Sequence, residues 1–318
     1  MILIDKQSIE NSVSASGLIN AVEKAYSIMD QPSTLIPDRM HVSKGDDTLL
    51  LMPGFTSSSM GTKLVSVFPG NRAKNKPAIY GIFVLNDAGT GAPVAVINGT
   101  KLTAVRTGAV GAAAVKHLAP ADAKVLGVIG TGVQAFHQAL MILKTTNFEK
   151  LIIGARSFEK ADAMKQLLEQ ETNIEIEITT DNNALVRKSD VIVTATSSSV
   201  PVFDVKPHEL KNKTIVAIGS YKPDMQELPL SVFEVAENVF VDTMHAKRES
   251  GDIKIPLEKG AIKEDDVIPF SELMKNPELK NNGLNVFKSV GMALFDITCA
   301  DLIYRNAKKK GLGTKIDL

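Results

Sequence analysis

A glycine-rich loop near the middle of the chain has the spacing of a dinucleotide phosphate site. It lies between an apolar run and a helical pattern, and it reads Gly130-Thr131-Gly132-Val133-Gln134-Ala135. In such a loop Gly130 permits a tight turn, Gly132 lets a pyrophosphate approach the backbone, and Ala135 lets the helix pack closely on the strand. The first amides of the helix, aided by its dipole, bind the phosphates. The spacing therefore predicts an NAD(P) site, with a plain turn as the alternative.

The next strand indicates which nicotinamide cofactor is bound. NAD sites usually place an acidic residue at the end of this strand to bond the ribose diol, but here the strand ends in Gly154-Ala155-Arg156-Ser157. Glu149 precedes the strand and is at the wrong end for that contact. Because a guanidinium fork matches phosphate oxygens, Arg156 and Ser157 suit the 2′-phosphate of NADP. We expect NADPH in preference to NADH, with NAD as the alternative cofactor and a purely structural role as the alternative for Arg156.

Three cations in the first part of the chain stand where a ligand could meet them: Arg39, Lys63 and Arg106. Lys63 lies at the start of an expected strand, and Arg106 lies in a helix that is otherwise small or apolar. A charge in so plain a helix must reach water, a partner carboxylate or a ligand. Taken singly, each cation suits a surface or ion-paired position. Together, beside a dinucleotide fold, they predict a carboxylate-binding pocket.

The first part of the chain has the pattern of an α+β domain with a mainly antiparallel sheet. Residues 8–29 place apolar side chains at helical spacing, and residues 103–117 predict an alanine-rich helix. Short apolar runs ending in turn signals are typical of antiparallel strands. They occur at residues 49–52, 63–68, 80–85 and 93–97.

From residue 124 onward, strands and helices alternate, which predicts an α/β fold with a doubly wound, Rossmann-type parallel sheet. The expected strands are Lys124–Ile129, Lys150–Ala155, Ile174–Ile178, Asp190–Thr194, Thr214–Ile218 and Val239–Asp242. We expect a last long helix from about Asn285 to Lys308, with an apolar face that packs back on the first domain. The expected domains are residues 1–117, joined by the C-terminal helix at 295–318, and residues 118–294.

The composition excludes several classes of partner. The chain has 318 residues, enough for two domains, and its 36 basic and 36 acidic residues give no electrostatic reason to bind nucleic acid or a membrane surface. The single cysteine, Cys299, excludes an internal disulfide, and the scattered histidines do not suggest a metal site. The sequence shows neither a signal-peptide pattern nor an uncharged apolar stretch of about 18 residues. We expect a cytoplasmic protein with a small-molecule partner.

Six segments in a fixed order make the chain resemble the ornithine cyclodeaminase/mu-crystallin family over nearly its full length. They are Gly61-Thr62-Lys63, residues 103–109, 127–135 and 217–220, Glu249-Ser250-Gly251-Asp252, and residues 286–291. The family unites ornithine cyclodeaminase, archaeal-type alanine dehydrogenase, and ketimine or Δ1-pyrroline-2-carboxylate reductases. The resemblance implies a homodimer formed through the first domain, which would also bind the substrate.

The resemblance also implies roles for individual residues. Arg39 and Arg106 would hold the substrate carboxylate, and Lys63 would contact the substrate near its reacting atoms as the catalytic residue. Ser220, assigned to substrate binding, stands where ornithine cyclodeaminase carries a proton-transferring aspartate, which argues against ornithine cyclisation. The cofactor would be bound by Arg106, Gly130, Thr131, Gly132, Val133, Gln134, Arg156, Ser157, Thr196 and Ser289.

The function implied by the resemblance is NAD(P)H-dependent reduction of a small cyclic 2-imino acid to the L-amino acid. The candidate substrates are Δ1-pyrroline-2-carboxylate and Δ1-piperideine-2-carboxylate. Lys63 would donate a proton or stabilise charge through a water molecule. Two alternatives stay open: ornithine cyclodeaminase or alanine dehydrogenase activity, and a mu-crystallin-type protein that binds NADPH and a small ligand without useful turnover.

Overall fold

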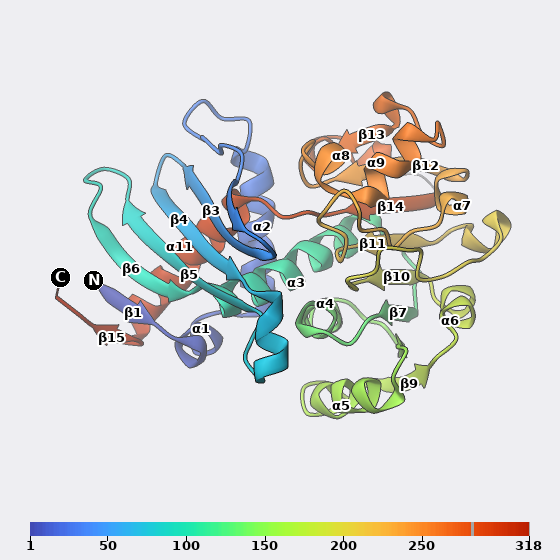
Figure 1. Cartoon of the computed structure of the whole chain (residues 1–318), viewed down its shortest axis with the longest axis horizontal. Coiled ribbons are helices and arrows are strands. Elements are labelled where there is room, and N and C mark those ends of the chain that lie inside the picture. Colours follow the sequence, from blue (N-terminus) through green and yellow to red (C-terminus); the bar gives the residue numbers. More distant parts are fainter. Residues whose placement is uncertain (281–282, 318) are drawn as a thin grey trace. The chain divides into compact units, whose positions relative to one another are not determined.

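In the computed structural model, which describes residues 1–280 and 283–317, the chain divides into two compact units. The first unit contains Met1–Arg106 and Met292–Leu318, and the second contains Thr107–Gly291. The division falls inside one long helix, α3 (Gly99–Leu118), and so lies earlier in the chain than the expected boundary after residue 117. Figure 1 labels most of the helices and strands of both units.

The first unit is built on a seven-stranded sheet with the order β15-β1-β6-β5-β4-β3-β2. The β1 strand pairs with β6 in parallel, and the other neighbouring pairs are antiparallel, which confirms the predicted class of sheet. The strands are β1 (Ile2–Ile4), β2 (Met40–Lys44), β3 (Asp47–Phe55), β4 (Ser59–Val67), β5 (Ile79–Asp87), β6 (Pro93–Asn98) and β15 (Thr314–Lys315).

Among the described residues, three α-helices belong wholly to the first unit: α1 (Lys6–Ser12), α2 (Ala15–Ile28) and α11 (Ala293–Lys310). The prediction of one helix over residues 8–29 was wrong, because the chain is extended at Ser14 and its hydroxyl accepts a hydrogen bond from the amide of Gly17 at 3.2 Å. A serine that caps a helix in this way starts a new helix. The α11 helix contacts α2 and strands β3, β4 and β5.

Strand alternation gives this sheet a covered face and an exposed face. Met52, Lys63 and Phe83 are in register across β3, β4 and β5, and all three are buried. Leu64 and Ile82 form the next row, and they are 37% and 45% exposed. The same exposed face carries further large apolar side chains, namely Met40, Val42, Phe55 and Tyr80.

The second unit contains an eight-stranded parallel sheet with the order β13-β12-β14-β11-β10-β7-β8-β9. All six strands expected here are present, within a few residues at their ends. The strands are β7 (Val125–Ile129), β8 (Lys150–Gly154), β9 (Glu175–Thr179), β10 (Val191–Thr194), β11 (Thr214–Ala217), β12 (Ala236–Val241), β13 (Val267–Pro269) and β14 (Leu284–Lys288). The strand order reverses between β7 and β10, and ligands bind at such switch points in doubly wound sheets.

Short helices connect these strands. They are α4 (Val133–Leu143), α5 (Phe158–Glu169), α6 (Asn182–Lys188), α7 (Leu230–Phe233), α8 (Ala246–Glu249), α9 (Gly251–Glu258) and α10 (Phe270–Lys275). The 3-10 helices of the chain are Pro69–Lys74, Pro207–Leu210, Glu264–Asp266 and Pro277–Leu279. None of the helices in the described part of the chain is both long and apolar enough to cross a membrane.

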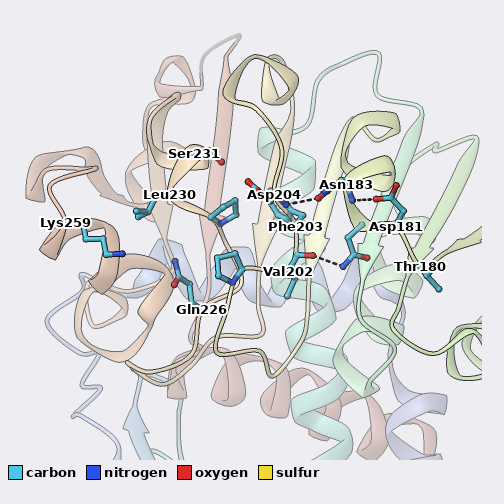
Figure 2. A pocket seen from close by; sticks show the side chains of 13 residues that line it. Thr180, Asp181, Asn183, Val202, Phe203, Asp204, Gln226, Leu230, Ser231 and Lys259 are labelled. Carbon is cyan, nitrogen blue, oxygen red and sulfur yellow. Dashed lines mark hydrogen bonds between the residues drawn. The ribbon is translucent and has the colours of Figure 1, made fainter.

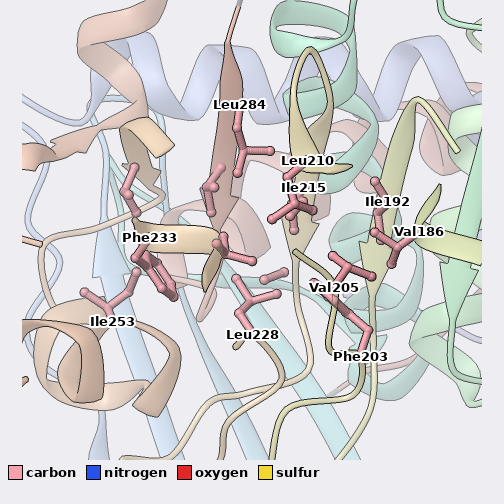
Figure 3. Packing of buried hydrophobic residues seen from close by; sticks show 14 of the residues in the cluster. Val186, Ile192, Phe203, Val205, Leu210, Ile215, Leu228, Phe233, Ile253 and Leu284 are labelled. Atoms are coloured by element: carbon pink, nitrogen blue, oxygen red, sulfur yellow. The ribbon is translucent and has the colours of Figure 1, made fainter. Parts of the chain in front are cut away.

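The predicted helix from Asn285 to Lys308 was wrong in its first part. Leu284–Lys288 is the buried strand β14, between β11 and β12, and the helix begins only at Ala293. A short apolar run fits a buried strand and a buried helix equally well, so its periodicity does not separate them. Side chains from β10, β11 and β14, including Ile192, Ile215 and Leu284, belong to one apolar core in this unit (Figure 3).

Candidate functional site

A buried cluster of three charged side chains lies in the first unit. Asp296 accepts a hydrogen bond from Lys63 Nζ on its Oδ2 atom at 2.7 Å, and another from Arg106 Nε on its Oδ1 atom at 2.9 Å. Lys63, Arg106 and Asp296 are only 3%, 6% and 0% exposed. Two of the three predicted cations therefore meet at one carboxylate.

The local structure explains why these groups meet. Lys63 points to the covered face of the sheet because it alternates with the exposed Leu64, and α11 packs on that face. Asp296 lies in the first turn of α11, where the helix dipole also favours a negative charge. A charge removed from water without a partner costs several kcal/mol, so each cation at this depth needs the carboxylate.

The environment changes the proton affinities of this cluster. Burial lowers the pKa of Lys63 to about 8, although the charge of Asp296 opposes this, and the charges of Arg106 and the half-buried Arg39 lower it further. Burial raises the pKa of Asp296, but the charges of Lys63 and Arg106 outweigh that effect and hold it below its usual value. An ammonium group with a pKa near 8 can give up a proton close to neutral pH, as a general acid must.

Asp296 was missing from the sequence prediction. It is the one charged residue between Ser289 and Ala300. This isolation was the available signal, by the same reasoning that singled out Arg106. Cys299, on the same helix, is buried as expected, and burial raises its pKa to about 12, so its thiol stays protonated.

The glycine loop of the second unit has the features that a pyrophosphate requires. Gly130 has a φ of 122°, and a Cβ atom there would lie 2.6 Å from the carbonyl oxygen of Ala195, so a larger residue does not fit. Gly132 is the N-cap of α4 without a side-chain cap, and a Cβ atom on it would meet nothing within 4 Å. Open space therefore lies beside uncapped helix amides, as at other phosphate-binding helix starts.

The predicted 2′-phosphate residues follow β8, which is the neighbour of β7 in the sheet. Arg156 is exposed, and it makes no hydrogen bond or ion pair with the residues that the structure describes. The hydroxyl of Ser157 caps α5 by accepting a hydrogen bond from the amide of Lys160 at 3.4 Å. The geometry leaves the guanidinium of Arg156 able to meet an anionic ligand.

Three other predicted site residues make hydrogen bonds within the second unit. Thr196 donates from its amide and hydroxyl to the carboxylate of Glu227. The hydroxyl of Ser289 donates to Asp242 Oδ2 at 2.7 Å. Ser220 is wholly buried, and its hydroxyl bonds the carbonyl of Met225 at 2.7 Å and shares a hydrogen bond with Ser250. This geometry does not support a direct contact between Ser220 and a substrate.

A cavity of about 820 Å³ in the second unit lies among other residues. It is lined by residues 180–183, which connect β9 to α6 and form the start of that helix, and by residues 201–204 of the loop after β10 (Figure 2). Gln226, Leu230 and Lys259 complete much of the remaining wall. The side-chain amide of Asn182, the first residue of α6, donates to the carbonyl of Val202 at 2.7 Å and so joins this helix to the loop after β10. The lining includes none of the predicted cofactor residues, so this cavity is distinct from the glycine loop.

The whole chain is similar to proteins of one family. Residues 1–311 match the model of the ornithine cyclodeaminase/mu-crystallin family. A Delta(1)-pyrroline-2-carboxylate reductase from Bacillus cereus is 33% identical over 326 residues, and the match covers 100% of both chains.

Solved structures agree with this result. The structure of Thermococcus litoralis Delta(1)-pyrroline-2-carboxylate reductase in complex with NADH and L-proline has a TM-score of 0.91 and 31% identity, covering 99% of this chain and 100% of that chain. An archaeal alanine dehydrogenase dimer with bound NAD has a TM-score of 0.91 and 28% identity, covering 100% of this chain and 99% of that chain.

The depressed pKa of Lys63 predicts how the stability of the protein changes with pH. Between about pH 8 and 10.5 the folded lysine binds fewer protons than the unfolded one, so the free energy of unfolding rises with pH. Relative to Lys63→Met, the wild type should gain roughly 3 kcal/mol across this window. Urea unfolding at several pH values measures the difference. Replacing the partly exposed Lys165 with Met is the control, and parallel curves for wild type and Lys63→Met would contradict the depressed pKa of Lys63.

Proposed function

We propose that this chain, which belongs to the ornithine cyclodeaminase/mu-crystallin family, reduces small cyclic 2-imino acids with NAD(P)H. Δ1-Pyrroline-2-carboxylate would give L-proline, and Δ1-piperideine-2-carboxylate would give L-pipecolate. The observation that carries the proposal is the buried cluster of Lys63, Arg106 and Asp296. Full-length similarity to reductases of Δ1-pyrroline-2-carboxylate, one of them solved with NADH and L-proline, supports it.

The arginines bind the substrate carboxylate in this proposal. Asp296 engages only the Nε atom of Arg106, which orients the guanidinium and leaves its terminal nitrogens for a bidentate contact. Arg39 is near enough for its charge to lower the pKa of Lys63, and it supplies the second cation for the same carboxylate. Fixing the carboxylate in this way fixes the position of the imine and removes much of the entropic barrier.

Lys63 supplies the proton. Its ammonium group transfers a proton to the imine nitrogen and becomes a neutral amine. Protonation of the nitrogen makes the imine carbon more electrophilic. When bound, the nicotinamide supplies the hydride that this carbon accepts. Asp296 keeps Lys63 protonated before the transfer, because it raises a pKa that burial alone would depress further.

The glycine loop would bind the cofactor pyrophosphate through the first amides of α4, and Arg156 would bind the 2′-phosphate of NADP. The open space at Gly132 and the exposed guanidinium of Arg156 support this assignment. NADPH is therefore the proposed cofactor. NADH is the alternative, because the solved relatives contain NADH and NAD.

The assay that tests the activity is NADPH oxidation by the purified protein with Δ1-pyrroline-2-carboxylate. We expect turnover with the wild type, and a loss of at least about 100-fold in kcat for Lys63→Met without a change in NADPH affinity, because general acid catalysis contributes that much. Lys165→Met is again the control.

Different results would favour the other members of the family. Ammonia release from ornithine without net oxidation of NADPH would point to a cyclodeaminase, and NADH formation with L-alanine would point to alanine dehydrogenase. NADPH binding without turnover on any of these substrates would leave a ligand-binding protein.

The cofactor preference depends on Arg156 in this proposal. Replacing Arg156 with Ala should raise the KM for NADPH by roughly 10- to 100-fold, the value of one or two charge-assisted hydrogen bonds, and leave the KM for NADH nearly unchanged. Steady-state kinetics with both cofactors measures this, and Lys160→Ala, an exposed cation on α5, is the control. Equal effects on both cofactors would refute the assignment.

We also propose that two copies of the chain associate through the exposed face of the first sheet. A contiguous group of large apolar side chains in contact with water marks an interaction surface, and here the group includes Met40, Leu64 and Ile82. Homo-oligomers usually pair such surfaces around a twofold axis. The solved alanine dehydrogenase relative is a dimer.

Light scattering tests the association. The wild type should have twice the 34.2 kDa mass of the chain, and Ile82→Glu should shift it toward the monomer because a carboxylate would be buried in the interface. Leu167→Glu changes an equally exposed apolar residue on α5 and should have no effect. A monomeric wild type would disprove this part of the proposal.

A further inference from the structure

Glu227, which the mechanism above does not use, joins two loops in the second unit. Its carboxylate is wholly buried and accepts five hydrogen bonds. The Oε1 atom accepts from the amide and hydroxyl of Thr196 at 2.6 and 2.8 Å. The Oε2 atom accepts from the Thr194 hydroxyl at 3.0 Å and from the amides of Gly219 and Ser220 at 2.7 and 3.3 Å.

These donors lie at or just after the ends of two adjacent strands. Thr196 lies after β10 and Gly219 after β11, and the two strands are parallel, with Thr194 opposite Ala217. Loops at the same edge of a parallel sheet lie next to each other, and β10 also borders β7, the strand that leads into the glycine loop. The residue before Thr196 touches that loop, since the carbonyl of Ala195 is the atom that a side chain on Gly130 would strike.

The contact between the two loops leaves no space for adjustment. A Cβ atom on Gly219 would lie 2.0 Å from the carbonyl oxygen of Thr196 and 2.5 Å from Glu227. A change in the direction of either loop would therefore move the other.

Glu227 is itself held in place by buried charges. Its amide and that of Leu228 donate to Asp252 Oδ1 at 2.6 and 3.0 Å, and Lys288 Nζ bonds Asp252 Oδ2 at 3.2 Å. Burial raises the pKa of Glu227, and the charge of Lys288 opposes this. Both carboxylate oxygens accept hydrogen bonds, and every partner is a donor. This arrangement suits a structural hydrogen-bond acceptor.

The geometry points to Glu227 as a positioning residue for the cofactor: its carboxylate holds the loops after β10 and β11 together and so fixes Thr196 beside the glycine loop. This inference rests on the proposed binding of a nicotinamide dinucleotide there, although not on the identity of the imino acid. Glu227 acts through Thr196 and Gly219, so it is not a catalytic residue.

The test is the variant Glu227→Gln. Its side-chain amide nitrogen, which is a donor, would replace one acceptor oxygen and face the donors that now bond the carboxylate. We expect the Kd for NADPH, measured by fluorescence titration without any imino acid, to rise by about tenfold or more, equivalent to the loss of one charge-assisted hydrogen bond. The KM for NADPH should rise in parallel, and kcat at saturating NADPH should change much less.

Two further variants separate positioning from a general loss of stability. Val239→Ala removes buried volume from β12 outside the network, and it should lower the melting temperature with an unchanged Kd. Thr194→Val removes one donor to Glu227 and should weaken NADPH binding by a smaller factor. If Glu227→Gln does not fold, the Kd of Thr194→Val for NADPH tests the positioning role instead.

An unchanged Kd in folded Glu227→Gln, or in Thr194→Val where the first variant does not fold, would overturn the inference. Because the Kd is measured without substrate, weakened NADPH binding would support it even if the chain reduced no imino acid.

Discussion

Two positive charges from distant parts of the first unit share one carboxylate, and the arrangement of that unit depends on this pairing. Lys63 stands on the covered face of β4, where a lysine is tolerated only with a rigidly placed anion. The α11 helix packs on β3, β4 and β5 and brings Asp296 to that place. The chain leaves the first unit after Arg106 and returns to it at Met292, so the anion comes from the last helix.

The second unit uses buried carboxylates in a related way. Asp242 accepts hydrogen bonds from the hydroxyl of Ser289 and from the amides of Val290 and Gly291, which directly follow β14. Glu227 accepts from the amides of Thr196 and Gly219, which follow β10 and β11, and Asp252 accepts from the amides of Glu227 and Leu228. Backbone amides that leave a strand need new acceptors, and a charged acceptor forms the shorter and stronger bonds. Each of these carboxylates thus determines the path of a loop.

The sequence predicted those features that depend on neighbouring residues. The parallel strands, the glycine loop and its helix have local patterns, and they were found close to their true limits. The strand β14 was mistaken for helix because a buried strand of five residues has no distinguishing period. The single helix expected over residues 8–29 failed at Ser14, whose capping preference competes with helix continuation.

The partners within the site could not be predicted, since they depend on contacts between distant residues. Arg106 was expected to reach water, a partner carboxylate or a ligand, but nothing near it in the sequence indicates Asp296. Ser220 was given a role by its position in a motif, whereas the structure directs its hydroxyl to Met225 and Ser250. The carboxylate of Glu227 looks like any loop glutamate until its five donors are seen together.

The separation along the chain between Lys63 and Asp296, 233 residues, has a consequence for the order of folding. Until α11 docks, Lys63 on the covered face of the first sheet and Arg106 on α3 would both lack their anion, so this face stays hydrated and its apolar side chains stay accessible. Contacts between such remote segments form slowly because a long loop must close first. The first sheet, although all of its strands except β15 are made early during synthesis, therefore completes its core only after the last helix has docked.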